Sequence, residues 1–247
     1  CPSCVELSRD GGGSLDVVEI DAASHNGVDA ARDLRERAVF APARDRFKIF
    51  ILDEAHMVTP QGFNYGDYGR AGNRGPTLTE LRNQNHQAVV YGAKGFLWYT
   101  YSQYRNYPDL YLGMPFLARE MADLKAEVLA DDVSGAVTVN AAKPEHMHVS
   151  LRKVGDELTL FAVNTATEPQ AATFTVKGAP ANLFVVSEGR TVSLANGSFT
   201  DQFGGYATHI YSTREATGGR EQLADAQAAV DRDNAARRQG QIAALGF

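Results

Sequence analysis

Two acidic residues directly follow an apolar run in the first quarter of the chain. The run is FKIFIL, residues 47–52, and the acidic residues are Asp53 and Glu54. Aromatic and β-branched residues in so short a run are typical of a strand buried in a parallel sheet. At the end of such a strand, one carboxylate can hold the Mg²⁺ of a bound nucleotide through water, and the second can orient the attacking water. The alternative is a solvated acidic turn, and the pair alone favours that interpretation.

Two histidines, His146 and His148, have a spacing that would allow them to bind one metal ion. Residues two apart on a strand share one face, and such a pair binds a metal ion if a neighbouring element supplies a third ligand. Paired histidines on an exposed strand are more often simply solvated, and we prefer that interpretation from the sequence.

The chain has 247 residues, of which 44% are hydrophobic and 22% charged, and its net charge is −6. This is the composition of a globular protein, and the negative charge disfavours a general binder of nucleic acid or anionic membranes. No apolar run approaches the roughly 18–20 residues that span a bilayer. No signal peptide is visible, and the cellular location stays unknown. Cys1 and Cys4 are the two cysteines, too few for a disulfide framework.

The first 64 residues predict an α/β fragment with a partial parallel sheet. A strand is expected at residues 15–20, a helix with regularly spaced apolar residues at 29–40, and a second strand at 47–52. Residues 65–132 then differ in character, because they are rich in aromatic side chains. Thr77 and Glu80 form a capping-box signature that predicts a helix to about residue 89. A strand is predicted at 96–102 (FLWYTYS), and an amphipathic helix at 117–128.

Residues 133–213 alternate in hydrophobicity with a period of two, and turn residues recur at short intervals. This pattern predicts an antiparallel β-sandwich with a hairpin turn at 155–157. Residues 214–247 predict a helical or mobile tail. The expected class is therefore mixed α+β, with four parts at 1–64, 65–132, 133–213 and 214–247.

The segment DVVEIDAASHNGVDAARDLRERAVFAPARDRFKIFILDEAHMVTPQGFN closely resembles the bacterial clamp-loader ATPase subunit, DNA polymerase III gamma/tau, an AAA+ ATPase with a small zinc module. The resemblance covers residues 1–64. It implies that Asp53 and Glu54 are the Walker B acids that act on Mg-ATP. It also implies that Cys1 and Cys4 are the last two of four zinc ligands, and that clamp-loader subunits are partners.

The sequence departs from that family in two respects. The family's phosphate loop, G-x-x-x-x-G-K-[ST], does not occur in it, and neither do the first two zinc cysteines. Because that loop supplies the backbone N–H groups and the lysine that hold phosphates, we expect no ATP hydrolysis. Two thiolates are half of a closed zinc site. His25 and His56 could complete it in principle, although isolated histidines are more often surface residues.

The segment PTLTELRNQNHQAVVYGAKGFLWYTYSQY resembles the last βα units of a (β/α)₈-barrel glycoside hydrolase. FTDQFGGYATHIYST resembles the closing strand of the β-sandwich that follows many such barrels, so the resemblance covers about residues 65–213. Substrates of these barrels meet the C-terminal ends of the strands. The resemblance therefore implies that Trp98, Tyr99, Tyr101 and Gln103 contact sugar, although strand alternation predicts that about half of them pack inward.

The leading hypothesis is a composite chain in which a clamp-loader fragment is joined near residue 64 to the C-terminal part of a glycoside hydrolase. A glycosidase needs two carboxylates across the scissile bond. Asp67, Glu80 and Asp109 are available, but none falls at a strand end that the family uses, so we expect no complete active site. The alternatives are a genuine glycosidase-class protein with a replaced N-terminus, a nucleotide-binding replication subunit fragment, and a non-catalytic carbohydrate-binding β-sandwich whose partner is an oligosaccharide.

Overall fold

The structure is a computed structural model that describes residues 16–21, 49–53, 57–69, 72–98, 101–215 and 221–244. The chain divides into two compact units, Cys1–Met57 and Val58–Phe247. No helix within these described ranges is both long and apolar enough to cross a membrane.

In the first unit, two strands form a parallel pair. β1 (Val17–Asp21) lies beside β2 (Ile49–Asp53), and the register sets Val17 opposite Ile49 and Asp21 opposite Asp53. Both predicted strands are therefore confirmed, in the parallel arrangement that the apolar sequence of β2 favours. The helix predicted at 29–40 lies outside the described residues.

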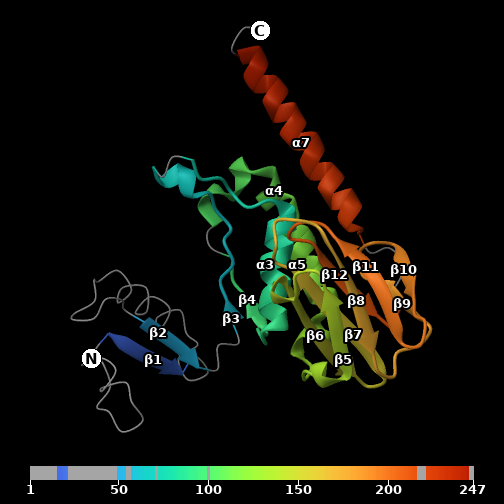
Figure 1. Cartoon of the computed structure of the whole chain (residues 1–247). Coiled ribbons are helices and arrows are strands. Elements are labelled where there is room, and N and C mark those ends of the chain that lie inside the picture. Colours follow the sequence, from blue (N-terminus) through green and yellow to red (C-terminus); the bar gives the residue numbers. More distant parts are fainter. Residues whose placement is uncertain are drawn as a thin grey trace. The chain divides into compact units, whose positions relative to one another are not determined.

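The second unit is built on the antiparallel β-sandwich that the period-two pattern predicts (Figure 1). One sheet has five strands in the order β10–β9–β12–β7–β6, and the other has three in the order β11–β8–β5. The strands are β5 (Val137–Ala141), β6 (Met147–Val154), β7 (Glu157–Asn164), β8 (Gln170–Val176), β9 (Asn182–Val185), β10 (Arg190–Ser193), β11 (Ser198–Phe203) and β12 (Thr208–Ser212).

The hairpin between β6 and β7 contains the predicted turn. The register sets Val154 opposite Glu157, which leaves Gly155 and Asp156 as a two-residue turn. Gly155 has a φ of 61°, a left-handed conformation that glycine adopts without steric cost and that short hairpin turns require.

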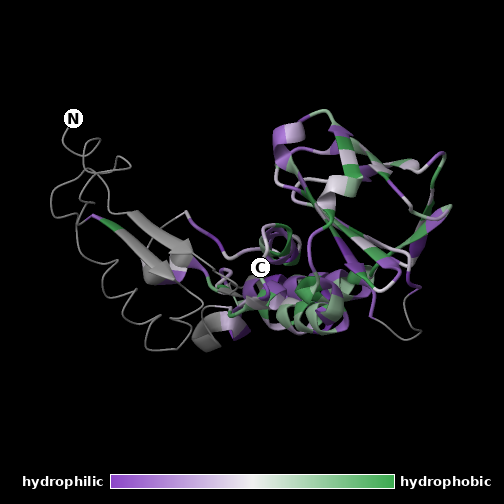
Figure 2. Cartoon of the chain, turned by 90° about the horizontal axis from the view of Figure 1, so that it is seen from below, coloured by the Kyte–Doolittle hydropathy of each residue, from purple (hydrophilic) through white to green (hydrophobic). Residues whose placement is uncertain are grey.

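The five-stranded sheet is buried on both faces. Leu160 belongs to the apolar core between the two sheets, together with Phe174 of the opposite sheet. Its neighbour Phe161 points the other way and belongs to a second core, together with Val89 from a helix. β7 is accordingly buried at most of its positions, whereas β8 of the three-stranded sheet alternates buried residues with more exposed ones. Figure 2 shows both hydrophobic and hydrophilic residues along the strands of the sandwich.

Helices cover the outer face of this sheet. They are α3 (Leu78–Val90), α5 (Gly113–Asp123) and α6 (Lys125–Leu129). The predicted capping box is confirmed, because the Thr77 side chain accepts from the Glu80 N–H while the Glu80 carboxylate accepts from the Thr77 N–H. The helix predicted at 117–128 is interrupted at Leu124, which has φ −96° and ψ 13°, so that α5 and α6 are two separate helices.

The prediction of a strand at 96–102 is wrong. β4 comprises only Gly95–Phe96 and pairs with β3 (Met57–Val58), where the Leu97 N–H donates to the Val58 carbonyl at 3.0 Å. The chain then forms the 3-10 helix η2 (Tyr101–Asn106) and α4 (Pro108–Tyr111). A barrel strand has a partner on each side, whereas the described residues give this segment a partner on one side only. The remaining 3-10 turns are η1 (Tyr65–Tyr68), η3 (Ser134–Ala136) and η4 (Pro144–His146).

The C-terminal tail contains the helix α7 (Leu223–Ala244), which extends away from the sandwich in Figure 1. Ala226 and Val230 are buried in an apolar cluster with residues of α3, α4 and α5. One turn further along, the Asn234 side chain donates to Asp109 at 3.2 Å. The described part of the tail is therefore helical from Leu223 to Ala244, and the first half of α7 is anchored to the helical layer.

Candidate functional site

The predicted acidic and cysteine residues lie in the first unit. Asp53 is the last residue of β2, and the register sets it opposite Asp21, so both residues stand at the carboxyl ends of parallel strands. Ligands of open parallel sheets bind at that end. Cys1, Cys4 and Glu54 lie outside the described residues, so the zinc and Mg-ATP assignments remain predictions.

Trp98 is half-buried. Its indole N–H donates to Asn85 Oδ1 at 3.1 Å, and its ring packs against the apolar cluster that α3, α4, α5 and α7 share. It also lines a mostly apolar pocket of about 370 Å³. Tyr101 and Gln103 belong to η2 rather than to a strand, and Tyr99 lies outside the described residues. A sugar-contact role for these four residues therefore remains a prediction.

A second pocket in the same unit, of about 510 Å³, is polar. Carboxamide side chains are its commonest lining groups, so we call it the carboxamide pocket. Carboxamides offer both donors and acceptors without a net charge, which suits a neutral, hydroxyl-rich ligand. The residues that line the carboxamide pocket include Gln61, Arg74, Glu80, Asn83, Gln84, Gln87, Thr165 and Tyr206.

Helix α3 positions three of these carboxamides. Asn83 and Gln87 are four residues apart and therefore lie on one side of the helix. The Asn83 side chain donates to the Tyr206 carbonyl at 2.8 Å, and Gln84 Oε1 accepts from the Gln61 N–H at 3.2 Å. The Gln87 carboxamide makes no hydrogen bond to another residue of the described ranges. Gln87 is therefore available to a ligand.

Tyr206 lies on a tightly fixed turn of the pocket wall. It has a φ of 56°, a conformation that costs a non-glycine residue on the order of 1–3 kcal/mol and is common at binding and catalytic sites. The preceding Gly205 approaches Thr167 so closely that a Cβ would lie 2.0 Å from the Thr167 carbonyl oxygen. The Tyr206 N–H also donates to the Ala166 carbonyl at 2.9 Å. These contacts fix the backbone of Tyr206 where this residue lines the pocket.

Glu80 is the one carboxylate among the described residues that line this pocket. Arg74 Nη2 lies 2.6 Å from Glu80 Oε1, and this hydrogen bond is the main reason why the pKa of Glu80 is lowered to about 2. Its other oxygen accepts from the Thr77 N–H at 2.8 Å. Glu80 is therefore ionised near neutral pH, and its oxygens are already occupied by the helix cap and the arginine.

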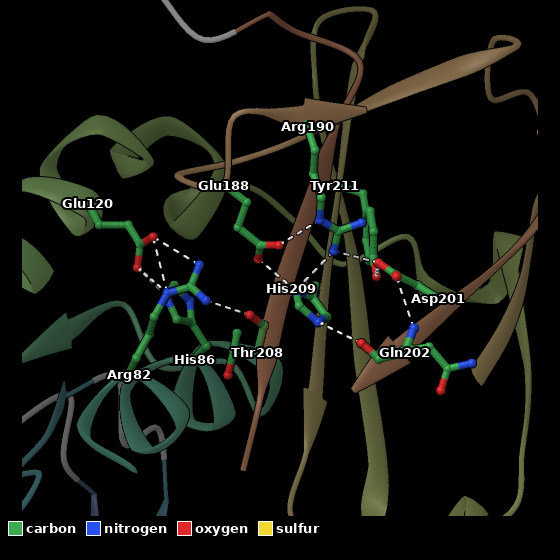
Figure 3. A network of polar contacts seen from close by, with 10 residues as sticks. All are labelled: Arg82, His86, Glu120, Glu188, Arg190, Asp201, Gln202, Thr208, His209 and Tyr211. Atoms are coloured by element: carbon green, nitrogen blue, oxygen red, sulfur yellow. Dashed lines mark hydrogen bonds and ion pairs between the residues drawn. The ribbon is translucent and has the colours of Figure 1, made fainter. Parts of the chain in front are cut away.

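A buried charged network lies between α3, α5 and the sheet (Figure 3). The Arg82 guanidinium donates to both oxygens of Glu120 at 3.0–3.2 Å and to the Thr208 carbonyl, while His86 Nε2 lies 2.9 Å from Glu120 Oε2. Burial acts to raise the pKa of Glu120, but the charge of Arg82 and the hydrogen bonds outweigh it, so that pKa is lowered. Burial lowers the pKa of His86, and Glu120 offsets this only in part. We therefore assign a neutral His86 that donates from Nε2 to an ionised Glu120.

A second network in Figure 3 links the two sheets at one edge. Arg190 of β10 lies 2.7 Å from Asp201 of β11, and the Tyr211 hydroxyl donates to the same carboxylate at 2.7 Å. His209 Nδ1 lies 2.6 Å from Glu188 Oε1. Burial and the Asp201 charge raise the pKa of Tyr211, which keeps its hydroxyl protonated as a donor. Because each charge has a partner, we assign both networks to the fold.

The carboxamide pocket was not predicted from the sequence, although the sequence contains two signals for it. Along the helix, the run RNQNHQ at 82–87 contains two pairs at i, i+4 spacing. Arg82 and His86 enter the buried network, and Asn83 and Gln87 line the pocket. The Gly-Gly-Tyr sequence at 204–206 is the second signal, since glycines allow the close turn that presents Tyr206.

No group of three or more His, Cys, Asp or Glu side chains suited to a metal ion occurs within the described ranges.

No family model matches the chain. The N-terminal segment is similar to curated proteins over 64 residues, or 26% of the chain. It is 61% identical to DNA polymerase III subunit gamma/tau of Mycobacterium tuberculosis (strain ATCC 25618 / H37Rv) and 44% identical to the tau subunit of Escherichia coli (strain K12). The match spans 11% and 10% of those two proteins, so this chain covers about a tenth of their length.

The structure is similar to parts of solved glycoside hydrolases. For an α-amylase from Geobacillus thermoleovorans in complex with acarbose, the TM-score is 0.44 at 15% identity, covering 57% of this chain and 34% of that one. For a GH30 endoxylanase from Clostridium papyrosolvens C71, the TM-score is 0.40 at 15% identity, covering 56% and 38%.

Proposed function

We propose that the unit Val58–Phe247 binds a neutral oligosaccharide in the carboxamide pocket and does not hydrolyse it. The observation that carries this proposal is the pocket wall, in which the unoccupied Gln87 carboxamide stands near a strained, fixed Tyr206. Sugar hydroxyls form hydrogen bonds with carboxamides in both directions. An aromatic ring beside them offers a flat apolar face for the C–H side of a sugar.

The charges in the pocket support binding rather than hydrolysis. Hydrolysis of a glycoside uses a carboxylic acid as proton donor and a second carboxylate as nucleophile or base. Glu80 is the one described lining carboxylate, and its pKa of about 2 prevents it from donating a proton near neutral pH. Because Arg74 balances its charge, the pocket favours a neutral ligand over an ionic one.

The whole chain, in this proposal, is a composite. The N-terminal segment is similar to clamp-loader gamma/tau subunits, and Asp53 stands at the end of a parallel strand where such a protein would hold Mg-ATP. The candidate function of that segment is therefore nucleotide binding, with Glu54 as the second acid, Cys1 and Cys4 on zinc, and clamp-loader subunits as partners. Calorimetry with Mg-ATP on the chain and on Asp53→Asn tests this function separately, and binding that Asp53→Asn leaves unchanged would reject it.

The oligosaccharide proposal is tested by titrating the full chain with neutral trisaccharides of glucose, xylose and galactose, followed by amide chemical shifts. We expect saturable shifts with a Kd of about 1 mM, a binding free energy of about −4 kcal/mol. Gln87→Ala and Tyr206→Ala should weaken binding, whereas Thr79→Ala, an exposed position on the same helix, serves as the matched control.

Two outcomes contradict the proposal. Trisaccharide binding that survives both pocket variants but disappears in Trp98→Phe would move the site to the apolar pocket and to the residues implied by the barrel resemblance. Release of reducing sugar by the purified chain, lost in Glu80→Gln, would show that the pocket is catalytic.

A further inference from the structure

Two histidines occupy the rim of the five-stranded sheet, on the face that the helices cover. His146 ends η4, and His148 is the second residue of β6. The register sets His148 opposite Val163, which is buried under the helices. Both histidines are half-buried, and neither belongs to the two charged networks.

The pairing of the strands brings the two imidazole rings to one point. Thr165 follows β7, and its N–H donates to the His146 carbonyl at 2.8 Å. Its hydroxyl Oγ1 lies 3.2 Å from His146 Nδ1 and 3.2 Å from His148 Nε2. The two ring nitrogens are therefore separated by no more than twice that distance, and both are directed at the same hydroxyl.

A third side chain fixes the orientation of one of these rings. The Tyr91 hydroxyl, at the end of α3, lies 2.8 Å from His148 Nδ1, and the two rings are 5.6 Å apart between centroids. With Nδ1 held by Tyr91, the Nε2 nitrogen of His148 faces Thr165. Histidines that bind metals generally have their second nitrogen engaged in this way, because it sets the tautomer and the direction of the ring.

We propose that His146 Nδ1 and His148 Nε2 together bind a divalent transition-metal ion of the class that prefers imidazole, such as Cu²⁺ or Zn²⁺. Neutral imidazole nitrogens bind such ions at about 2.0–2.1 Å. One ion bound at that distance by both nitrogens requires them to lie within about 4 Å of each other, which the two rings can reach by rotation of their side chains toward a shared ion. Two protein nitrogens leave the other positions to water and the threonine hydroxyl, so the site is open and weaker than a closed four-ligand site.

The geometry distinguishes this pair from two solvated surface histidines. Solvated side chains have no reason to converge, whereas these two point at one oxygen atom and one of them is held from behind by Tyr91. The sequence spacing alone could not establish this, because the shared hydroxyl and the tyrosine come from residues far away in the chain.

The test uses Cu²⁺ and the full chain carrying Cys1→Ser and Cys4→Ser, which removes the thiolates as competing ligands. We expect one Cu²⁺ to bind by calorimetry, with an electron paramagnetic resonance spectrum that shows nitrogen ligands. His146→Ala and His148→Ala should each weaken binding by about 100-fold. Tyr91→Phe should weaken it by about 10-fold, the lower end of the effect of losing a hydrogen-bonding partner of a ligand.

Thr79→Ala, at an exposed position of α3, is the control variant and should leave Cu²⁺ affinity unchanged. Copper binding that persists in both His146→Ala and His148→Ala, or no binding to the cysteine-free chain, overturns the proposal. His146 lies on a 3-10 turn without buried residues, so His146→Ala should not disturb the fold. A loss of Cu²⁺ affinity in His146→Ala with an unchanged circular dichroism spectrum therefore reports metal binding and not misfolding.

Discussion

Helix α3 carries two sets of polar side chains. The side chains of one set are hydrogen-bonded to other parts of the protein, and the side chain of the other has a carboxamide without such a bond in the described ranges. Arg82 and His86 are buried against the sheet, where the Arg82 guanidinium donates to Glu120 and the Thr208 carbonyl and His86 Nε2 donates to Glu120. All charges of this set are paired, and the neutral His86 keeps one ring nitrogen, Nδ1, without a hydrogen-bond partner in the described residues. The Gln87 carboxamide lines the carboxamide pocket and makes no hydrogen bond to another described residue. Satisfied buried charges hold a structure together, whereas unsatisfied groups at a pocket wall are available to a ligand. We therefore assign a role in stability to Arg82 and His86 and a role in binding to Gln87.

The largest expected effect comes from removing one partner of the buried set. Glu120→Ala leaves Arg82 charged and buried without a carboxylate, which should lower the free energy of unfolding by about 3–5 kcal/mol. Chemical denaturation measures this loss. Glu120→Gln, which retains an acceptor, should lose less, and Glu168→Ala is an exposed control that should be near wild type. A Glu120→Ala loss no larger than that of Glu168→Ala would remove the distinction between the two sets.

The buried set should also make stability depend on pH. The pKa of His86 is lowered in the folded protein by burial, while an unfolded histidine titrates near 6.5. The stabilising contribution of neutral His86 is therefore complete above about pH 6.5 and is lost as the pH falls, because the unfolded chain then binds the proton more readily. Urea unfolding between pH 8 and 5 should show this slope, and His86→Gln should flatten it. Equal slopes in both chains would place the titrating group elsewhere.

Removing the cap of helix α3, which borders the carboxamide pocket, should have an intermediate effect on the free energy of unfolding. Thr77→Ala removes the acceptor for the Glu80 N–H and should destabilise the protein by about 1 kcal/mol. Thr79→Ala, two positions further on the exposed side of α3, should change the free energy of unfolding by no more than about 0.5 kcal/mol. If Thr77→Ala and Thr79→Ala have the same free energy of unfolding, the cap does not stabilise α3.

The smallest effect on stability is expected at the pocket itself. Gln87→Ala should leave the free energy of unfolding within about 0.5 kcal/mol of wild type and still reduce trisaccharide binding. The same protein sample serves for both measurements, by denaturation and by chemical-shift titration. A variant that loses stability and binding together would show that Gln87 belongs to the structural set after all.

Local patterns along the chain predict most of the architecture. The capping box at Thr77, the strands of the sandwich and the turn at 155–157 all follow from a few neighbouring residues, and all are confirmed. The prediction of a strand at 96–102, which also relied on local sequence, is wrong. The aromatic residues of this segment suit a buried strand, but a strand also needs neighbours, and local sequence does not say whether they exist.

The polar sites depend on contacts between distant residues and could not be predicted in the same way. The side chain of Asn83 meets the backbone of Tyr206, and both meet at the carboxamide pocket. The charged network likewise joins α3 to β12. The sequence shows that RNQNHQ is polar along a helix, but the partition of its residues between interior and pocket depends on where the sheet lies.

The bond from the Arg82 guanidinium to the Thr208 carbonyl connects residues 126 positions apart. During synthesis, α3 emerges long before β12, which completes the sheet face beneath it. Until then the apolar core under α3, which includes Val89 and Phe161, lacks Ile210 of β12, and contacts of such long range form slowly. Exposed apolar surface of this kind promotes aggregation of incomplete chains. We therefore expect a nascent chain arrested before residue 208 to be retained by chaperones, and release to coincide with the emergence of β12.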